Sequence, residues 1–220
     1  MNDGSVNTIR GRGQSPLAWG VAACLVALAS IGCQKPPEPR TNAAASAKSA
    51  DRHEDLEAGR EIALLAGGCF WGMEEILRQI PGVLDVEAGY TGGSTKNPRY
   101  SDVHTGFTGH AEAVRVVFDP GRISYEELLE KYFFRMHDPT TKNRQGNDVG
   151  TQYRSAIFAT TPQQREIAEQ VKERVEASGF WKKPIVTQIA DAGPFTLAEE
   201  EHQDYLQKHP NGYTCHFLRD

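Results

Sequence analysis

The sequence contains few cysteines, and none of its four cysteines stands in a paired motif. It has no CxxC pair, no HExxH and no paired Cys/His spacing, so neither a structural zinc site nor a local dithiol motif is predicted. The net charge of -5 gives no reason to expect nucleic acid or an anionic membrane surface as the main ligand. Any cysteine chemistry must therefore join residues that are far apart in the sequence.

Charged residues are missing from residues 16–32, which are rich in Ala, Leu and Val and follow a basic segment. This pattern, with small residues ahead of Cys33, is typical of an export signal. Ser30-Ile31-Gly32-Cys33 resembles the lipobox of bacterial lipoproteins, so residues 1–32 are expected to be removed as a signal peptide that includes Cys24, and Cys33 to be lipidated. The alternative is an uncleaved anchor, because the run is close to the ~18 residues that span a bilayer. Both interpretations place the rest of the chain outside the cytoplasm.

Residues 33–57 lack apolar periodicity and are rich in Pro, Ala, Ser and charge. Such a composition predicts a flexible tether, which leaves residues 58–220 as the folded domain. The chain is 39% hydrophobic and 9% aromatic, which is enough for a buried core. No internal repeat is visible in the sequence.

The domain is organised around Gly67-Gly68-Cys69-Phe70-Trp71-Gly72. The apolar run Glu61 to Ala66 predicts a short buried strand, and the spacing from Met73 to Ile80 predicts a helix. Cys69 would then lie at a helix N-terminus, where unpaired backbone N–H groups and the helix dipole stabilise a thiolate. Because the flanking glycines also let a ligand approach closely, a reactive thiol is favoured over a small buried hydrophobe.

The rest of the domain reads as alternating strands, loops and helices. Strands are predicted over 83–90, 110–118, 153–159 and 185–190, long polar loops over 89–109 and 138–150, and helices over 124–137, 161–178 and 196–208. Capping boxes indicate the starts of two of these helices, at Ser124 with Glu127 and at Thr196 with Glu199. The order β-α-β-β-α-β predicts an α/β (α+β) fold of the ferredoxin-like split βαβ type, with a mixed sheet covered by helices. A C-terminal α-β-α extension and an irregular tail holding Cys215 follow.

Four motifs in this order resemble those of peptide methionine sulfoxide reductase A: Gly68-Cys69-Phe70-Trp71-Gly72, Gly109-His110-Ala111-Glu112-Ala113-Val114, Gly146-Asn147-Asp148 with Gly150-Thr151-Gln152-Tyr153-Arg154-Ser155, and Asn211-Gly212-Tyr213-Thr214-Cys215-His216. The likeness runs from about Ala63 to Arg219. It implies an enzyme that reduces methionine (S)-sulfoxide, free or in proteins, to methionine, with Cys69 as the nucleophile. The choice of epimer rests on the resemblance alone.

Proton donors are needed beside such a nucleophile, because the sulfoxide oxygen is a poor leaving group. The resemblance assigns this role to Glu112, Tyr100 and Tyr153. Burial of Glu112 in mid-strand would raise its pKa and keep it protonated, whereas the alternative is a salt-bridged carboxylate on an edge strand. For the tyrosines the alternative is simple packing. Asp148 is expected to orient Tyr153 or to shape the surroundings of Cys69, although loop aspartates are commonly turn residues.

Phe70 and Trp71 are two large side chains next to the nucleophile. The resemblance makes them an apolar pocket for the S-methyl group, where a sulfur-aromatic contact contributes ~0.3 to 1.5 kcal/mol. Core packing is the alternative. No metal site and no prosthetic cofactor are expected.

Once methionine has left, Cys69 would be a sulfenic acid, which a second thiol can condense into a disulfide. Cys215 is the only other cysteine in the predicted domain, and it lies in a tail that follows a glycine and can move to Cys69. Its alternative role is a fixed structural disulfide. A thioredoxin-like donor outside the cytoplasm is expected to reduce the Cys69–Cys215 bond in a monomeric protein. A thiol peroxidase and a tethered binding module with a fixed disulfide are the competing interpretations.

Overall fold

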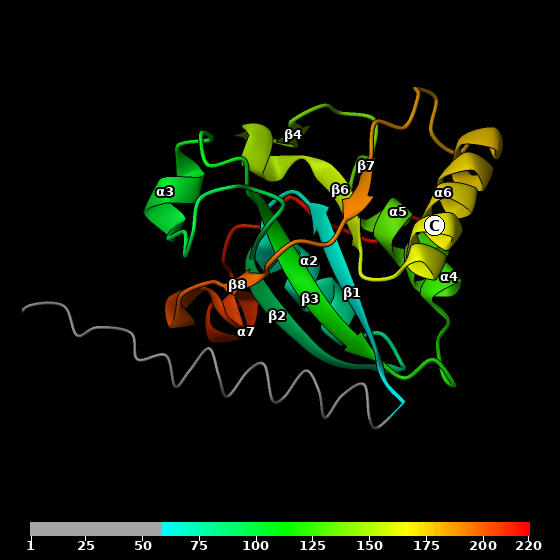
Figure 1. The fold of residues 1–220 in the computed structure, drawn as a ribbon, viewed down its shortest axis with the longest axis horizontal. Coiled ribbons are helices and arrows are strands. Elements are labelled where there is room, and N and C mark those ends of the chain that lie inside the picture. The colour runs from blue at the N-terminus through cyan, green and yellow to red at the C-terminus, as the bar shows by residue number, and fades with distance from the viewer. Residues whose placement is uncertain (1–58) are drawn as a thin grey trace, which may run out of the picture. The chain divides into compact units, whose positions relative to one another are not determined.

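The computed structural model describes residues 59–220, so the predicted signal peptide, the tether and Cys33 lie outside the described residues. A six-stranded sheet with the order β7-β6-β1-β3-β2-β8 forms the centre of this part of the chain (Figure 1). Its strands are β1 (Glu61–Gly67), β2 (Val83–Thr91), β3 (Ala111–Phe118), β6 (Ser155–Ala159), β7 (Gln188–Asp191) and β8 (Thr196–Leu197). Neighbouring strands are antiparallel except for β6 and β7, so the sheet is mixed, as predicted. The inner order β6-β1-β3-β2 confirms the split βαβ arrangement.

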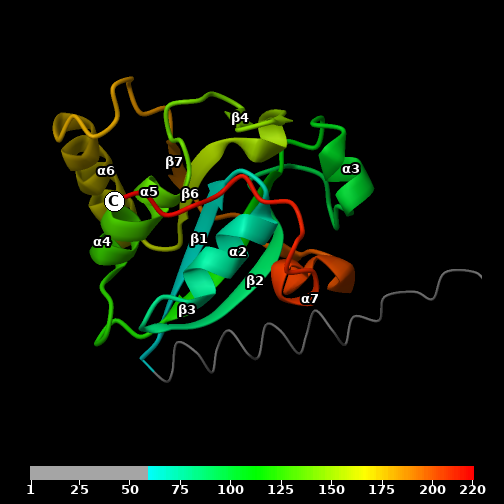
Figure 2. The ribbon, with the colours of Figure 1, turned by 180° about the vertical axis from the view of Figure 1, so that it is seen from behind.

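Helices cover one face of the sheet. Seen from behind, α2 (Phe70–Arg78) lies across the central strands, with α4 (Tyr125–Glu127), α5 (Phe134–Met136) and α6 (Pro162–Ala177) beside it (Figure 2). The main hydrophobic cluster fills the space between this layer and the sheet, and a smaller cluster with Phe195 against it covers the opposite face. All eight residues of β3 are therefore buried, because both faces of this central strand are covered.

Local signals in the sequence predict several helix starts correctly. Cys69 is the N-cap of α2, directly after β1. The capping box of α4 is present, since the Ser124 hydroxyl accepts from the Glu127 N–H at 3.1 Å and the Glu127 carboxylate accepts from the Ser124 N–H at 3.4 Å. This helix continues as a π-helical segment (Leu128–Phe133) and ends with α5 at Met136.

The two regions predicted as loops contain short elements. Residues 89–109 include α3 (Tyr100–His104). The start of this helix is capped, because the Asp102 carboxylate accepts from the Arg99 N–H at 3.0 Å. Residues 138–150 include the hairpin β4 (Arg144–Gln145) and β5 (Asp148–Val149). Both elements are too short to give a periodic signal.

The predicted helix over 196–208 is wrong. Thr196 instead pairs with Tyr90 as part of β8, and a 3-10 turn (Glu200–His202) and α7 (Tyr205–Lys208) follow. The Glu199 carboxylate accepts from the Tyr90 hydroxyl at 2.9 Å and from the Tyr100 N–H at 3.2 Å, so it makes tertiary contacts instead of a helix cap. The predicted strand 185–190 begins only at Gln188, because the N–H of Val186 donates to Pro139 instead of a sheet neighbour.

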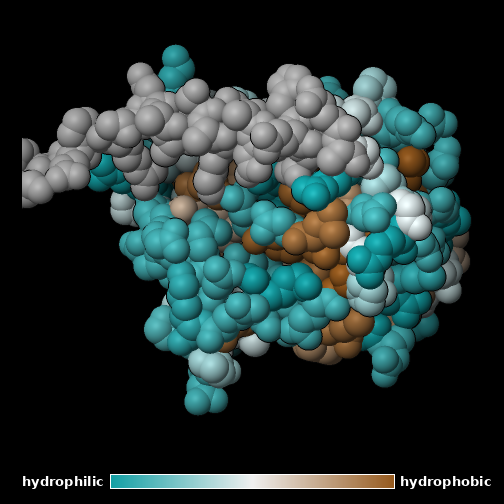
Figure 3. All heavy atoms as spheres, turned by 90° about the horizontal axis from the view of Figure 1, so that it is seen from below, coloured by the Kyte–Doolittle hydropathy of each residue, from teal (hydrophilic) through white to brown (hydrophobic). Residues whose placement is uncertain are grey.

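The end of the domain seen from below exposes an apolar area ringed by hydrophilic residues (Figure 3). Within residues 59–220, no helix is both long enough and apolar enough to cross a membrane.

Candidate active site

Cys69 lies at the turn between β1, whose carboxyl end is its upper end in Figure 1, and α2. Its thiol is free but only 6% exposed. Burial raises the pKa of Cys69 well above its ordinary value, the nearby Glu112 adds to this rise, and a hydrogen bond from the Trp71 backbone opposes it. The expected resting thiolate therefore does not agree with the structure, because desolvation outweighs the helix N-terminus. The thiol must lose its proton during the reaction.

Glu112 sits on β3 in the middle of the sheet, paired with Tyr90 of β2. This position contradicts the edge-strand alternative. The side chain is 2% exposed, and its carboxyl accepts from the Phe70 N–H at 3.2 Å. Burial raises the pKa of Glu112 to about 8, with the charge of Asp148 adding to the rise. The carboxyl is therefore protonated at neutral pH, in agreement with the expected donor form.

Tyr100 and Tyr153 come from separate elements but reach the same place. Tyr100 begins α3, and Tyr153 ends a 3-10 turn (Thr151–Tyr153). Burial raises the pKa of Tyr100 to about 12 and that of Tyr153 further, and the charges of Glu112, Asp148 and Cys69 raise both. Each phenol thus lies within electrostatic range of the nucleophile and stays protonated, as a hydrogen-bond donor must.

Cys215 lies directly beside the Cys69 turn. Its Sγ donates to Asp148 Oδ2 at 3.3 Å, and the Cys69 backbone lies near enough to the Cys215 thiol to lower its pKa, against the larger effect of burial. Burial, followed by the hydrogen bond to Asp148, raises the pKa of Cys215 to about 12. The described cysteines are both free thiols, so the structure contains no fixed disulfide between them.

The C-terminal tail carrying Cys215 is already docked, whereas the sequence suggested that it must move to Cys69. Its path crosses the start of α2 and ends beside α5 (Figure 2). The buried His216 anchors it, because Nε2 donates to the Gly67 carbonyl at 2.8 Å. Further along, the Arg219 N–H donates to the Arg135 carbonyl at 3.2 Å. The two thiols are therefore neighbours before any reaction takes place.

Phe70 and Trp71 take different positions. Phe70 is 0% exposed in the main cluster, with its ring centroid 5.8 Å from that of Tyr90, so core packing describes it in this structure. Trp71 is half-buried, donates through Nε1 to His202 Nδ1 at 3.2 Å, and stacks on Tyr205 at 3.7 Å. Contact of either ring with a substrate methyl group stays a prediction.

Sequence reasoning missed several residues that build the site. His216 and Tyr213 flank Cys215 inside a motif already noted, so their closeness to the thiol was an available signal. His202 and Tyr205, which hold Trp71, gave no such signal, because they were assigned to one continuous helix.

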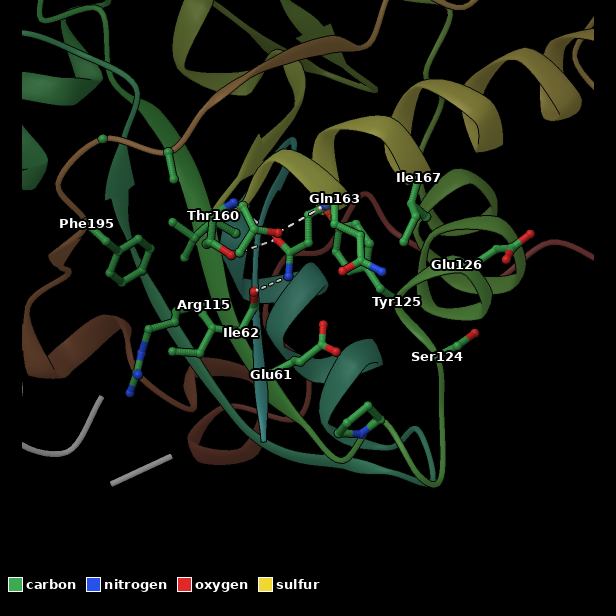
Figure 4. Close-up of a pocket in the computed structure, with 16 residues that line it drawn as sticks. Glu61, Ile62, Arg115, Ser124, Tyr125, Glu126, Thr160, Gln163, Ile167 and Phe195 are labelled. Atoms are coloured by element: carbon green, nitrogen blue, oxygen red, sulfur yellow. Dashed lines mark hydrogen bonds between the residues drawn. The ribbon is translucent and has the colours of Figure 1, made fainter. Parts of the chain in front are cut away.

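The structure also contains a cleft of about 620 Å³ at the other end of β1. Glu61 and Ile62 of β1, Tyr125 of α4 and Ile167 of α6 line it (Figure 4). None of its lining residues belongs to the group around Cys69, so the thiol site is a separate place. Among residues 59–220, no group of three or more His, Cys, Asp or Glu side chains is arranged to hold a metal ion.

An α/β domain that brings two free thiols, a protonated carboxyl and two phenols to one strand-helix junction defines a thiol-dependent oxidoreductase. The comparisons agree with this class. A model of the peptide methionine sulfoxide reductase family matches residues 61–219. The chain belongs to this family and is an enzyme that reduces methionine sulfoxide.

Curated relatives and solved structures support the assignment. Peptide methionine sulfoxide reductase MsrA 1 of Mesorhizobium japonicum is 55% identical over 164 residues, which cover 74% of this chain and 92% of the relative. The MsrA of Pseudomonas fluorescens is 56% identical over 159 residues, which cover 72% of this chain and 74% of the relative. Mxr1 of Saccharomyces cerevisiae in reduced form superposes with a TM-score of 0.69 at 38% identity, over 73% of this chain and 93% of that one. A structure of Mxr1 in complex with Trx2 has a TM-score of 0.50 at 27% identity, over 73% of this chain and 91% of that one.

Proposed function

We propose that this chain reduces the S epimer of methionine sulfoxide, free or in proteins, through a sulfenic acid on Cys69 and a Cys69–Cys215 disulfide. The docked tail carries this proposal, because the 2.8 Å hydrogen bond from His216 to the Gly67 carbonyl holds the neighbouring Cys215 thiol at the Cys69 turn. A thioredoxin-like protein then reduces the disulfide. The activity is protein repair after oxidative damage.

In the first step the Cys69 sulfur attacks the sulfoxide sulfur, and the oxygen passes to Cys69. The thiol sulfur is oxidised by two electrons and the sulfoxide sulfur is reduced by two, giving methionine and a sulfenic acid. Glu112, Tyr100 and Tyr153 donate hydrogen bonds to the oxygen as its charge develops. The Cys69 proton ends on the transferred oxygen, so no net proton is gained or lost.

In the second step the Cys215 sulfur attacks the Cys69 sulfenic acid and water leaves, forming the disulfide. The reductant then attacks Cys215, which is half-buried, in preference to the more deeply buried Cys69. Tyr213, two residues before Cys215, is 42% exposed, and Val149, the residue after Asp148, is 65% exposed, so both offer apolar surface to a protein donor. The complex of the related Mxr1 with Trx2 supports a donor of the thioredoxin type.

A single-turnover assay of Cys215→Ser tests the proposal. Prereduced mutant should release about one methionine per enzyme and then stop with thioredoxin as donor, because no disulfide forms. Dithiothreitol should restore turnover by reducing the sulfenic acid directly. Normal recycling of the mutant with thioredoxin would contradict the resolving role.

Two competing functions can be distinguished by measuring the consumption of peroxide beside that of methionine sulfoxide. A thiol peroxidase would consume peroxide faster than methionine sulfoxide. A binding module with a fixed disulfide would consume neither and would have no free Cys69 thiol in the isolated protein.

We also propose that the enzyme is exported and held at the membrane only by a lipid on Cys33, with residues 33–57 as the tether of a monomer. The charge-free run before Cys33 supports this proposal.

A further inference from the structure

The proton of the Cys215 thiol has a defined acceptor in the structure. Asp148 Oδ2 lies 3.3 Å from Cys215 Sγ. The β4–β5 hairpin fixes Asp148, because Asp148 pairs with Gln145 across the turn at Gly146. This turn packs on the tail, since a Cβ added to Gly146 would lie 3.2 Å from Cys215 Cβ. Both partners of the hydrogen bond are therefore held by backbone structure.

Tyr213 is the third member of this group. Burial raises the pKa of Tyr213, and the charges of Cys215 and Asp148 add to this rise, so its phenol lies near both groups. Tyr213 lies two residues before Cys215 on the tail. Tyr213 therefore brings a third polar group to the pair formed by Asp148 and Cys215, which are 67 residues apart in the sequence.

We propose that Asp148 is the catalytic base of the resolving step and that Tyr213 is its positioning residue. This inference deepens the proposed function and rests on it. As the Cys215 sulfur attacks the Cys69 sulfenic acid, Asp148 takes the Cys215 proton and passes it to the departing hydroxyl, which leaves as water. The S–S bond forms, the S–O bond of the sulfenic acid breaks, Cys215 is oxidised and the sulfenic sulfur is reduced.

A base is needed at this point because Cys215 is a thiol, not a thiolate, in the structure. Burial and the Asp148 carboxylate raise the pKa of Cys215 to about 12, so solvent alone ionises a very small fraction at neutral pH. The other titratable groups facing Cys215 are Cys69, Tyr213 and His216. His216 Nδ1 lies 3.5 Å from Cys215 Sγ, farther away than Asp148 Oδ2 at 3.3 Å, so the carboxylate is the nearer acceptor of the thiol proton.

The test measures the two steps separately in prereduced Asp148→Asn. Methionine release in the first turnover should continue, whereas formation of the Cys69–Cys215 disulfide should slow by about 100-fold, the lower end of the usual contribution of a general base. The sulfenic acid on Cys69 should accumulate and be trapped by dimedone. The disulfide rate of the mutant should rise more steeply with pH than that of the wild type, because hydroxide replaces the missing base.

Tyr213→Phe should slow disulfide formation by about two- to tenfold, the value of one hydrogen bond, without changing its pH profile. Tyr132→Phe and Asp191→Asn, which remove the same groups elsewhere on the domain, should behave as the wild type. Melting curves on the same samples identify any unfolded variant, and the Phe variant keeps the proposal testable if Asp148→Asn does not fold.

Disulfide formation at the wild-type rate in Asp148→Asn would overturn the proposal and point to His216 or to direct proton transfer. Equal slowing of methionine release and of disulfide formation would also overturn it, because Asp148 would then act in the first step. If wild type itself releases methionine but forms no Cys69–Cys215 disulfide, the proposed function has failed, and this result differs from both of the others.

Discussion

Gly72 is the point where α2 meets the C-terminal tail, and Gly72→Ala tests whether docking of the tail controls recycling. A Cβ at this helical position would lie 2.6 Å from His216 Nδ1 and would also clash with Thr214 Oγ1. His216 cannot swing away without breaking its 2.8 Å hydrogen bond to Gly67. The added methyl group should therefore lift the tail off the Cys69 turn.

The size of the effect follows from the bonds that hold the tail. Lifting it loses the His216–Gly67 and Cys215–Asp148 hydrogen bonds, together about 1 to 3 kcal/mol, or about 5- to 150-fold in the docked fraction. Alanine offsets part of this loss in overall stability, because it is about 1 kcal/mol better than glycine inside a helix. We expect the free energy of unfolding to change by less than about 2 kcal/mol while disulfide formation slows by at least about fivefold.

The assay compares thioredoxin-supported turnover with dithiothreitol-supported turnover in the same preparation. Gly72→Ala should lose activity with thioredoxin and keep it with dithiothreitol, which does not require Cys215. Gly193→Ala is the matched control, because a Cβ there meets no atom within 4 Å. Thioredoxin-supported turnover of Gly72→Ala equal to that of Gly193→Ala would refute the reasoning.

Three further predictions concern single residues. Because Glu112 must be protonated and its pKa is about 8, kcat should fall above pH 8, whereas Glu112→Gln should have a lower kcat that does not change with pH in this range. In the wild type the free energy of unfolding should also fall as the pH rises from about 4.3 to about 8, and in the mutant it should change less, which denaturation at several pH values would check. Phe70→Ala should lower the free energy of unfolding by about 3 to 5 kcal/mol in urea titrations, because it empties a fully buried site, and a loss under 1 kcal/mol would contradict the core role. Cys33→Ala should no longer incorporate labelled fatty acid, and equal labelling of both forms would exclude the lipobox.

The fold was predictable where local signals decide the structure. The apolar run of β1 and the helical spacing after it placed Cys69 at the start of α2, and the Ser124 capping box marked α4. Thr196 and Glu199 carry the same local signal, but Thr196 pairs with the edge of β2, and Glu199 accepts hydrogen bonds from the Tyr90 hydroxyl and the Tyr100 backbone N–H. Local chemistry could not reveal that competition, because its partners are about 100 residues away.

The site was predictable in its residues and less so in its electrostatics. The motifs indicated Glu112 and Cys215, and the structure places both close to Cys69. The ionisation of Cys69 was predicted in the wrong direction, because the helix terminus is visible in the sequence whereas the burial and the carboxylates that oppose it are not. Asp148 was assigned to Tyr153 or Cys69, yet its hydrogen bond goes to Cys215.

The central claim is that the Cys69 sulfur takes the oxygen from methionine sulfoxide. The most direct measurement is the methionine released in a single turnover by prereduced wild type and Cys69→Ser, followed by chromatography without added reductant. The account predicts about one methionine per wild-type enzyme and none from the mutant, with matching melting curves. Release by Cys69→Ser within about tenfold of the wild-type rate, a barrier change of only about 1.4 kcal/mol, would contradict it.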